Sequence, residues 1–486
     1  MRSIVLLILF FLCFLPFSSC EDWLKEEPKA IAVETFYNTP NEADAAVGAP
    51  IAKIRNAYTQ VFPSLMETFA DYNYGRGSWR SNSDYQGLNA TNIGRTDGVW
   101  TNFYQAIRDC NIGINGISGA TEMNEQQIAS YIGELKFLRA FCYFQLVQFW
   151  DAIPLRTENN LGQWEMGKSP ASEIYELIVN DLIYAAANAP QTPRLAGTPG
   201  RNSSRSLLSQ VYLQLGDYSN AKKISDEVIN SGEYSLVPVS TSRDFDKIFG
   251  PDIITSTEEI FYLKTSRTNN AGLTYAMMMA HPNARIDGKK MHGGGGWYAI
   301  CTTTENRMII EWDDNDLRKN FNLLPFNFGD PEFNCLLTKF HDPDASGASA
   351  NVAMPLIRYP DILLVNAEAD TKLAGKVTAQ ALEKINMIHR RGYGRNPNIP
   401  SDVDFELTDY QSLDSFMDLL IIEQAYETWN EGKRWPFLVR LGVADEWVKK
   451  YKGLDIAPRH YLFPIPATEF TYNKGLDVLV DQNPGY

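Results

Sequence analysis

The sequence lacks the short motifs that mark most catalytic and metal-binding proteins. Its 486 residues include only 6 cysteines and 5 histidines, and none of them forms a CxxC pair, an HExxH pair or a comparable cluster. A GxSxG nucleophile elbow is missing as well. We therefore expect no metal site, no cofactor and no catalytic residue in this chain.

Basic side chains are scarce relative to acidic ones. The chain has 44 Lys and Arg residues against 59 Asp and Glu residues, which gives a formal net charge of -15. An acidic protein repels the phosphate backbone of DNA and RNA, and no basic run interleaved with aromatic residues argues otherwise. Nucleic acid is therefore excluded as the expected partner.

Long apolar runs are missing except at the N-terminus. Arg2 is followed there by an apolar run that ends at Phe17, and then by two serines and Cys20. The run is shorter than the roughly 20 apolar residues that a membrane-spanning helix needs. The pattern is typical of a lipoprotein signal peptide over residues 1–19, whose removal leaves Cys20 as the lipidated first residue.

Four cysteines remain in the body of the protein: Cys110, Cys142, Cys301 and Cys335. Cys142 lies in a helical pattern, which predicts a thiol packed in the core. A disulfide between Cys301 and Cys335 is possible in an exported protein.

Helical periodicity is the strongest structural signal. Apolar residues recur at steps of three and four between Tyr131 and Phe149, which predicts one face of a long helix. The segment 205–232 reads as a helical hairpin with a turn at Gly216, and a similar hairpin begins at Pro360. Each resembles a tetratricopeptide unit, but more than a hundred residues separate them, so we do not expect consecutive members of a regular array.

The region between these hairpins has a different character. Residues from about 235 to 355 contain scattered glycine and proline, four consecutive glycines at 293–296 and no sustained helical stripe. We predict a mainly α protein that forms a single body. Its scaffold of tetratricopeptide-like hairpins covers about 20–234 and 356–486, and an irregular insertion of loops and short strands interrupts it at about 235–355.

Several segments of the chain resemble the SusD/RagB family. The similarity begins near Trp23 and runs to the C-terminus, and the C-terminal third carries its most specific part. The matching segments there are Arg358-Tyr359-Pro360-Asp361 with Ala367-Glu368-Ala369, Glu423 to Arg440, Pro464-Ile465-Pro466 with Glu469, and Gln482-Asn483-Pro484-Gly485-Tyr486. The chain departs from the family at Gln424, where arginine is frequent, and at Pro436, where aspartate is usual and where we expect a disturbed helix.

The resemblance implies what the protein does. Members of the family are non-enzymatic nutrient-binding lipoproteins at the cell surface, anchored to the outer membrane beside a TonB-dependent, SusC-like transporter. They capture oligosaccharides, or peptides in some RagB-like members. The resemblance marks no ligand-binding residue, so candidates come from chemistry alone.

Sugars are bound by exposed aromatic faces flanked by amide, acid and guanidinium groups. Two irregular segments have this composition. The candidate ligand-binding residues are Tyr72, Asn73, Tyr74, Trp79 and Arg80 in the first segment, and Trp297 and Tyr298, which follow the glycine run, in the second. Glycine permits close backbone approach to a ligand. The alternative is that Trp79 and Trp297 close over the core; Trp100, in a helical stripe, is expected to be core.

Two further motifs carry weak signals. Residues 162–169 satisfy the P-loop spacing, but no buried strand precedes them and Trp164 crowds the loop, so nucleotide binding is not expected. Residues 342–347 open like a calcium loop, but Ala353 occupies the position that requires glutamate. A weak calcium site and a solvated acidic turn both stay open, and we favour the turn.

Two functions of other classes compete with nutrient binding. A glycoside hydrolase would need two carboxylates facing each other across the scissile bond, and composition alone does not exclude such a pair. A protein-binding helical-repeat scaffold would predict a groove lined by helices instead of aromatic loops.

Overall fold

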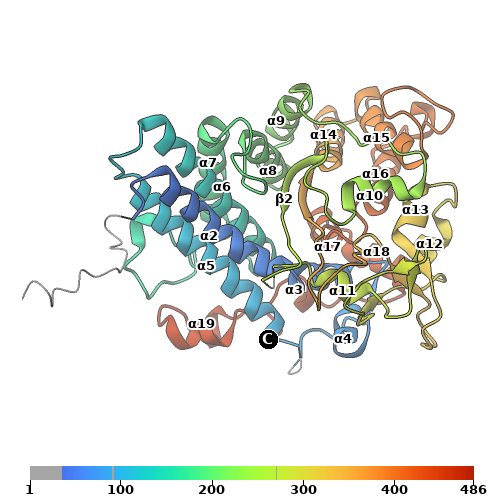
Figure 1. Ribbon diagram of the computed structural model, residues 1–486, viewed down its shortest axis with the longest axis horizontal. Helices are drawn as coiled ribbons and strands as arrows, with labels where there is room; N and C mark the ends of the chain where they lie inside the picture. Colours follow the sequence, from blue (N-terminus) through green and yellow to red (C-terminus); the bar gives the residue numbers. More distant parts are fainter. Residues whose placement is uncertain (1–35, 90–91, 270) are drawn as a thin grey trace, which may run out of the picture.

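The computed structural model describes residues 36–89, 92–269 and 271–486 of the chain. The signal peptide and Cys20 lie outside the described residues, so both stay predictions. The protein is mainly α-helical with short two-stranded sheets (Figure 1).

The N-terminal half is an array of antiparallel helices. Helices that follow one another in the chain pack as neighbours from α5 through α9, and α2 packs on α5 and α6 (Figure 1). The helices of this half are α2 (Pro40–Tyr58), α3 (Val61–Phe69), α4 (Arg80–Ser83), α5 (Gly94–Ile117), α6 (Glu125–Trp150), α7 (Ala171–Asn188), α8 (Arg201–Gln214) and α9 (Tyr218–Asn230).

Helix α6 is the predicted long helix. It begins after Asn124, whose side chain accepts a hydrogen bond from the Gln127 N–H at 2.9 Å, while the Gln127 side chain accepts one from the Asn124 N–H at 3.0 Å. This reciprocal capping satisfies donors that the first turn leaves free. Leu135, Leu138 and Cys142 along it are fully buried, so the expected core thiol is confirmed.

The two predicted hairpins are the pairs α8–α9 and α14–α15, where α14 spans Tyr359–Ala374 and α15 spans Ala379–Gly392. Pro360 lies in the first turn of α14, and Gly375 ends it in the left-handed conformation with φ of 64°. Although the hairpins are far apart in sequence, α14 packs against α9. The helical array therefore continues across the insertion, which the sequence separation had led us not to expect.

The insertion leaves and rejoins the array through one sheet. Strand β2 (Glu259–Leu263) pairs antiparallel with β8 (Met354–Arg358), so its entry and exit lie side by side. Its other elements are α10 (Asp246–Phe249), α11 (Tyr275–Met279), β3 (Arg285–Ile286), β4 (Lys289–Lys290), β5 (Ile300–Cys301), α12 (Arg307–Glu311), α13 (Leu317–Asn322), β6 (Leu323–Pro325) and β7 (Cys335–Leu337), and β5 pairs with β1 (Tyr74–Gly75) of the N-terminal half.

A buried ion-pair network joins the insertion to the C-terminal helices. Arg358 contacts Glu258, Glu427 and Glu431, and all four side chains are buried. Burial raises the pKa of Glu431, but the charges of Arg358, Lys339 and Lys433 outweigh it, so the pKa lies below its ordinary value. Glu431 is therefore ionised, and its role in the network is structural.

The C-terminal third ends in a series of shorter helices: α16 (Leu413–Thr428), α17 (Arg434–Leu441), α18 (Ala444–Lys452), α19 (Ala467–Tyr472) and α20 (Val478–Asp481). The expected disturbance at Pro436 is wrong, because α17 begins only two residues earlier and the first turn of a helix does not use its N–H groups. Gln424 accepts a hydrogen bond from Arg434 at 3.0 Å, so it is accommodated in the core.

The remaining cysteines are free thiols. Cys301 and Cys335 lie on the strands β5 and β7, are both buried, and are not bonded to each other. In the described part of the chain, no helix combines the length and apolarity needed to cross a bilayer.

Candidate functional site

The glycine run places Trp297 and Tyr298 at the surface of the insertion. The Trp297 N–H donates to the Met277 carbonyl at 2.9 Å, and the Tyr298 N–H donates to the Ala280 carbonyl at 2.9 Å. These bonds fix the backbone to helix α11 and the loop after it. The Trp297 side chain is 46% exposed, which is unusual for a large aromatic residue in a folded protein.

The glycines of the run have a structural role that their sequence pattern did not predict. A Cβ atom on Gly294 would lie 1.7 Å from the Gly347 carbonyl oxygen, and one on Gly296 would lie 2.0 Å from that of Ala280. Glycine is thus required at these two positions because the run packs against the protein's own backbone. The run is a structural support for the two aromatic residues that follow it.

Tyr298 belongs to a group of half-exposed rings that we call the insertion cluster: His281, Trp297, Tyr298, Phe326 and Phe328. The His281 ring lies 4.6 Å from Tyr298 and 4.9 Å from Phe326, and Tyr298 lies 5.8 Å from Phe328, measured between ring centroids. The indole of Trp297 makes no ring contact in the described part of the structure. Because Trp297 is 46% exposed, part of the indole is open to solvent.

Arg76 lies against the insertion cluster, and Arg80 is joined through Glu332 to the segment that follows Phe328. The Arg76 guanidinium lies over the rings of Tyr298 and Phe328, at 4.6 and 5.0 Å from their centroids, and its Nε donates to Asp330 at 2.8 Å. Arg80, which is exposed, forms ion pairs with Asp84 and Glu332 at 2.9 and 2.6 Å. Partial burial and the charge of Arg76 lower the pKa of His281, so this ring is neutral at pH 7.

The first predicted segment is largely buried, and this corrects three of our candidates. Tyr72 is fully buried and stacks on Trp429 at 3.7 Å. Asn73 is also fully buried and donates to Glu67 at 2.9 Å and to Asn430 at 2.7 Å.

Trp79 is 6% exposed, and the guanidinium of Arg95 covers its ring at 3.8 Å. Tyr72, Asn73 and Trp79 therefore present almost no surface to a ligand, because Tyr72 and Asn73 pack on the C-terminal residues Trp429 and Asn430 and Arg95 covers Trp79. Tyr74 is half-buried: its ring lies 5.1 Å from Phe333, and its hydroxyl accepts a hydrogen bond from Asn306 at 3.2 Å.

The turn at residues 342–347, which resembles the start of a calcium loop, has a structural explanation. The Asp342 carboxylate accepts hydrogen bonds from both the Nε and an Nη of Arg267, at 2.9 and 2.7 Å, and from the Asn351 N–H at 2.8 Å. These donors occupy the oxygens that calcium would need, so the turn is stabilised by an ion pair. Across the described ranges, no group of three or more His, Cys, Asp and Glu side chains is placed to hold a metal ion.

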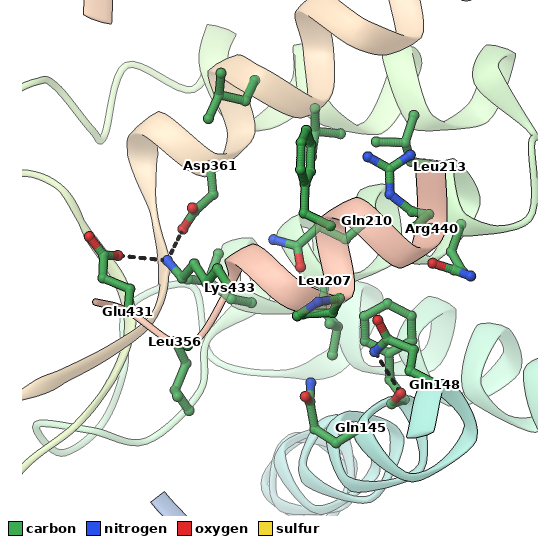
Figure 2. A pocket seen from close by; sticks show the side chains of 18 of the residues that line it. Gln145, Gln148, Leu207, Gln210, Leu213, Leu356, Asp361, Glu431, Lys433 and Arg440 are labelled. Carbon is green, nitrogen blue, oxygen red and sulfur yellow. Dashed lines mark hydrogen bonds and ion pairs between the residues drawn. The ribbon is translucent and has the colours of Figure 1, made fainter. Parts of the chain in front are cut away.

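A small cavity lies between the helices of the scaffold, as the protein-binding alternative would require. Figure 2 shows Lys433 of the turn before α17 between Asp361 and Glu431, and Arg440 of α17 nearby. Lys433 contacts these carboxylates at 2.6 and 3.0 Å, and Arg440 makes a bidentate pair with Glu368. The cavity has a volume of about 160 Å³, below the roughly 300 Å³ of ligand sites, and its cations are already paired.

A larger pocket of about 510 Å³ lies between α5, the irregular segment after α6, and α19. Trp100 and Tyr104 of α5 line it, together with Trp164 and Tyr472. Trp100 is 3% exposed and therefore core, as predicted, but it also forms the floor of this pocket. No sequence pattern predicts this pocket, because Trp164 and Tyr472 are about 300 residues apart and nothing local links them.

Comparisons with known proteins match nearly the whole chain. Residues 22–213 match a family described as "Starch-binding associating with outer membrane", and residues 274–486 match the SusD family. A curated relative, SusD-like protein P2 from Formosa agariphila, is 24% identical over 522 aligned residues that cover 99% of each chain.

Solved structures share the fold. A SusD homolog from Bacteroides thetaiotaomicron superposes with a TM-score of 0.78 at 20% identity, covering 93% of this chain and 98% of that one. A protein described as a laminarin-binding SusD-like protein gives a TM-score of 0.75 at 22% identity, covering 93% of this chain and 100% of that one.

Proposed function

Because the chain belongs to the SusD/RagB family, we propose that it is a cell-surface protein that captures an oligosaccharide on the insertion cluster and passes it to a TonB-dependent, SusC-like transporter. The observation that carries the proposal is the exposed indole of Trp297 in the insertion cluster, whose neighbouring ring Tyr298 is covered by Arg76. Flat aromatic faces match the C–H faces of sugar rings, and guanidinium and carboxylate groups match their hydroxyls.

The relatives support a saccharide as the ligand class. One solved neighbour is described as laminarin-binding, and one matching family as starch-binding. These descriptions concern other proteins, so the sugar that this chain binds is a matter for experiment. A peptide, as in RagB-like members, is the alternative ligand.

The role is binding and not catalysis. The acidic side chains nearest to the insertion cluster, Asp330 and Glu332, are each paired with an arginine at 2.8 and 2.6 Å. A glycosidase needs one of its two carboxyl groups protonated as the acid, whereas the partial burial of Asp330 is outweighed by hydrogen bonds and the charge of Arg76, so that its pKa lies below its ordinary value. This arrangement suits hydrogen bonding to hydroxyls.

The experiment is calorimetric titration of the chain without its lipid against neutral oligosaccharides, acidic oligosaccharides and peptides. Trp297→Ala is expected to weaken sugar binding about tenfold or more, Trp297→Phe to retain part of it, and Ile310→Ala, an exposed apolar control on α12, to leave it unchanged. Binding of peptides alone would transfer the proposal to peptide uptake, and release of shorter sugars would establish a hydrolase instead.

The location is tested separately. Lipidation of Cys20 would hold the protein at the outer membrane, so Cys20→Ser is expected to release it into the soluble fraction while the oligosaccharide affinity stays the same. A transporter that co-purifies with the lipidated protein would identify the partner. Recovery of Cys20→Ser in the outer-membrane fraction would contradict the lipid anchor.

A further inference from the structure

The pocket between α5 and α19 combines the features of a small-molecule site. Its volume of about 510 Å³ falls within the roughly 300–1,000 Å³ of known ligand pockets. Three separate parts of the chain form it: α5, the segment 156–164, and the C-terminal helix α19 with Asn473. None of the described residues that line it belongs to the insertion, and α19 lies apart from α11 in Figure 1, so the pocket is separate from the insertion cluster.

Two exposed rings stand at its rim over a fixed floor. The side chains of Trp164 and Tyr472 are 78% and 80% exposed, and neither ring contacts another ring within the described residues. Trp100, at the floor, donates its indole N–H to Glu469 at 3.3 Å and packs 4.7 Å from Tyr104. Large exposed aromatic side chains cost free energy in water, and when they flank a pocket they mark a binding site.

The segment that carries Trp164 is held in place although it is irregular. Arg156 donates to the carbonyl oxygens of Gln163 and Trp164 at 2.9 and 3.1 Å. Asn473 accepts from the Met166 N–H and donates to the Met166 carbonyl, both at 2.8 Å. The indole is therefore presented at the rim before any ligand arrives, which lowers the entropy lost on binding.

The polar groups of the pocket favour an uncharged ligand. Arg156 faces Glu469 at 3.9 Å, and Arg108 is paired with Asp109 at 2.7 Å, so both cations have acidic neighbours. By contrast, the side chains of Gln105, Thr101 and Thr468 line the pocket without a hydrogen-bond partner in the described part of the chain. Free amide and hydroxyl groups between aromatic faces match a hydroxylated, neutral ring.

We propose that this pocket is a second saccharide-binding site, which holds a neutral pyranose ring between Trp164 and Tyr472, with Gln105, Thr101 and Thr468 as hydrogen-bonding partners for its hydroxyls. The site is independent of the insertion cluster. A long glycan chain or a second, shorter molecule would occupy it through the same chemistry.

The test is fluorine NMR of the full chain labelled with 5-fluorotryptophan. The signal of Trp164 is assigned as the one that is missing from the spectrum of the variant Trp164→Phe. The probes are neutral oligosaccharides of glucose, mannose, galactose and xylose, added up to about 10 mM, a range that covers weak sites. The variant Trp297→Ala serves as the background, so that ligand at the insertion cluster does not contribute.

We expect at least one neutral sugar to shift the Trp164 resonance in this background, and Tyr472→Ala to weaken that binding about tenfold. Glu165→Ala, an exposed control in the same segment, should leave it unchanged. The proposal is overturned if no sugar in the panel moves the Trp164 resonance, or if the resonance moves only when a transporter protein is added. The failure of this site would leave the result for Trp297 untouched.

Discussion

The two aromatic segments that looked alike in sequence have opposite fates in the structure. Tyr72 and Trp79 in the first segment are buried, whereas Trp297 in the second is 46% exposed. The first segment packs beneath the insertion and against α16–α17. The second segment follows the glycine run 293–296, which holds it at the surface. Aromatic composition therefore indicates that the side chains of a segment pack against something. Tertiary packing decides whether they pack against the protein itself or stay available to a ligand.

The largest expected effect on stability comes from removal of the buried carboxylate of Asp71, next to Tyr72 in the first segment. Asp71 and Arg434 form a fully buried ion pair at 2.7 Å. Asp71→Ala leaves the arginine buried without its partner and should lower the free energy of unfolding by about 3–5 kcal/mol. The matched control is Asp402→Ala at the exposed pair with Arg395, expected to cost less than about 1 kcal/mol. Equal urea midpoints for the two variants would contradict the structural role of Asp71.

Exchange of the two tryptophans for alanine tests the comparison directly. Trp79→Ala removes a buried ring and should lower the free energy of unfolding by about 3 kcal/mol, with the sugar affinity of the folded protein little changed. Trp297→Ala should have the opposite effect: it should lose sugar affinity, while its free energy of unfolding changes by less than about 1 kcal/mol. Chemical denaturation and calorimetry measure both. If Trp79→Ala loses sugar affinity while its free energy of unfolding is unchanged, Trp79 belongs to the binding site after all.

Glu67 should make the buried segment sensitive to pH. Burial raises the pKa of this carboxyl from 4.5 to about 7, against hydrogen bonds from the Gly432 N–H and Asn73 that lower it. The folded state therefore holds the Glu67 proton more tightly, so the contribution of this group to stability is fully present below pH 4.5. It is lost as the pH rises through about 7, by up to about 3 kcal/mol.

Glu67→Gln should remove this part of the pH dependence, because its amide does not ionise. Unfolding midpoints at pH 5 and pH 8 for wild type and variant provide the measurement. A variant whose pH profile parallels that of wild type would show that Glu67 is not the titrating group.

The smallest effect concerns the support under the exposed segment. Gly296→Ala would place a methyl group 2.0 Å from the Ala280 carbonyl oxygen, and we expect a loss of about 1–3 kcal/mol together with weaker sugar binding as Trp297 moves. Gly98→Ala is the control, because a Cβ there meets nothing within 4 Å in helix α5. Substitution of a helical glycine should stabilise by about 0.5–1 kcal/mol. Thermal unfolding of both variants measures these changes in stability, and equal midpoints for the two variants would contradict the structural role of Gly296.

Much of the fold could be predicted because its signals are local. Helix α6 and the two hairpins α8–α9 and α14–α15 follow from apolar spacing, capping residues and terminal glycines within a few turns of each helix. Exposure of the candidate residues could not be predicted in this way: Trp297 and Arg80 are exposed and Tyr298 is half-buried, whereas Tyr72, Asn73 and Trp79 are buried. The binding role of the exposed residues stays a proposal.

The sequence by itself determined the helical scaffold, the position of the insertion and the resemblance to the family, because periodicity and motifs are properties of neighbouring residues. Tertiary structure alone decided that α9 packs on α14, that the glycine run supports its own backbone, and that Trp164 and Tyr472 flank one pocket. The physical reason is that burial of a side chain depends on which distant segments cover it, and no local pattern encodes that.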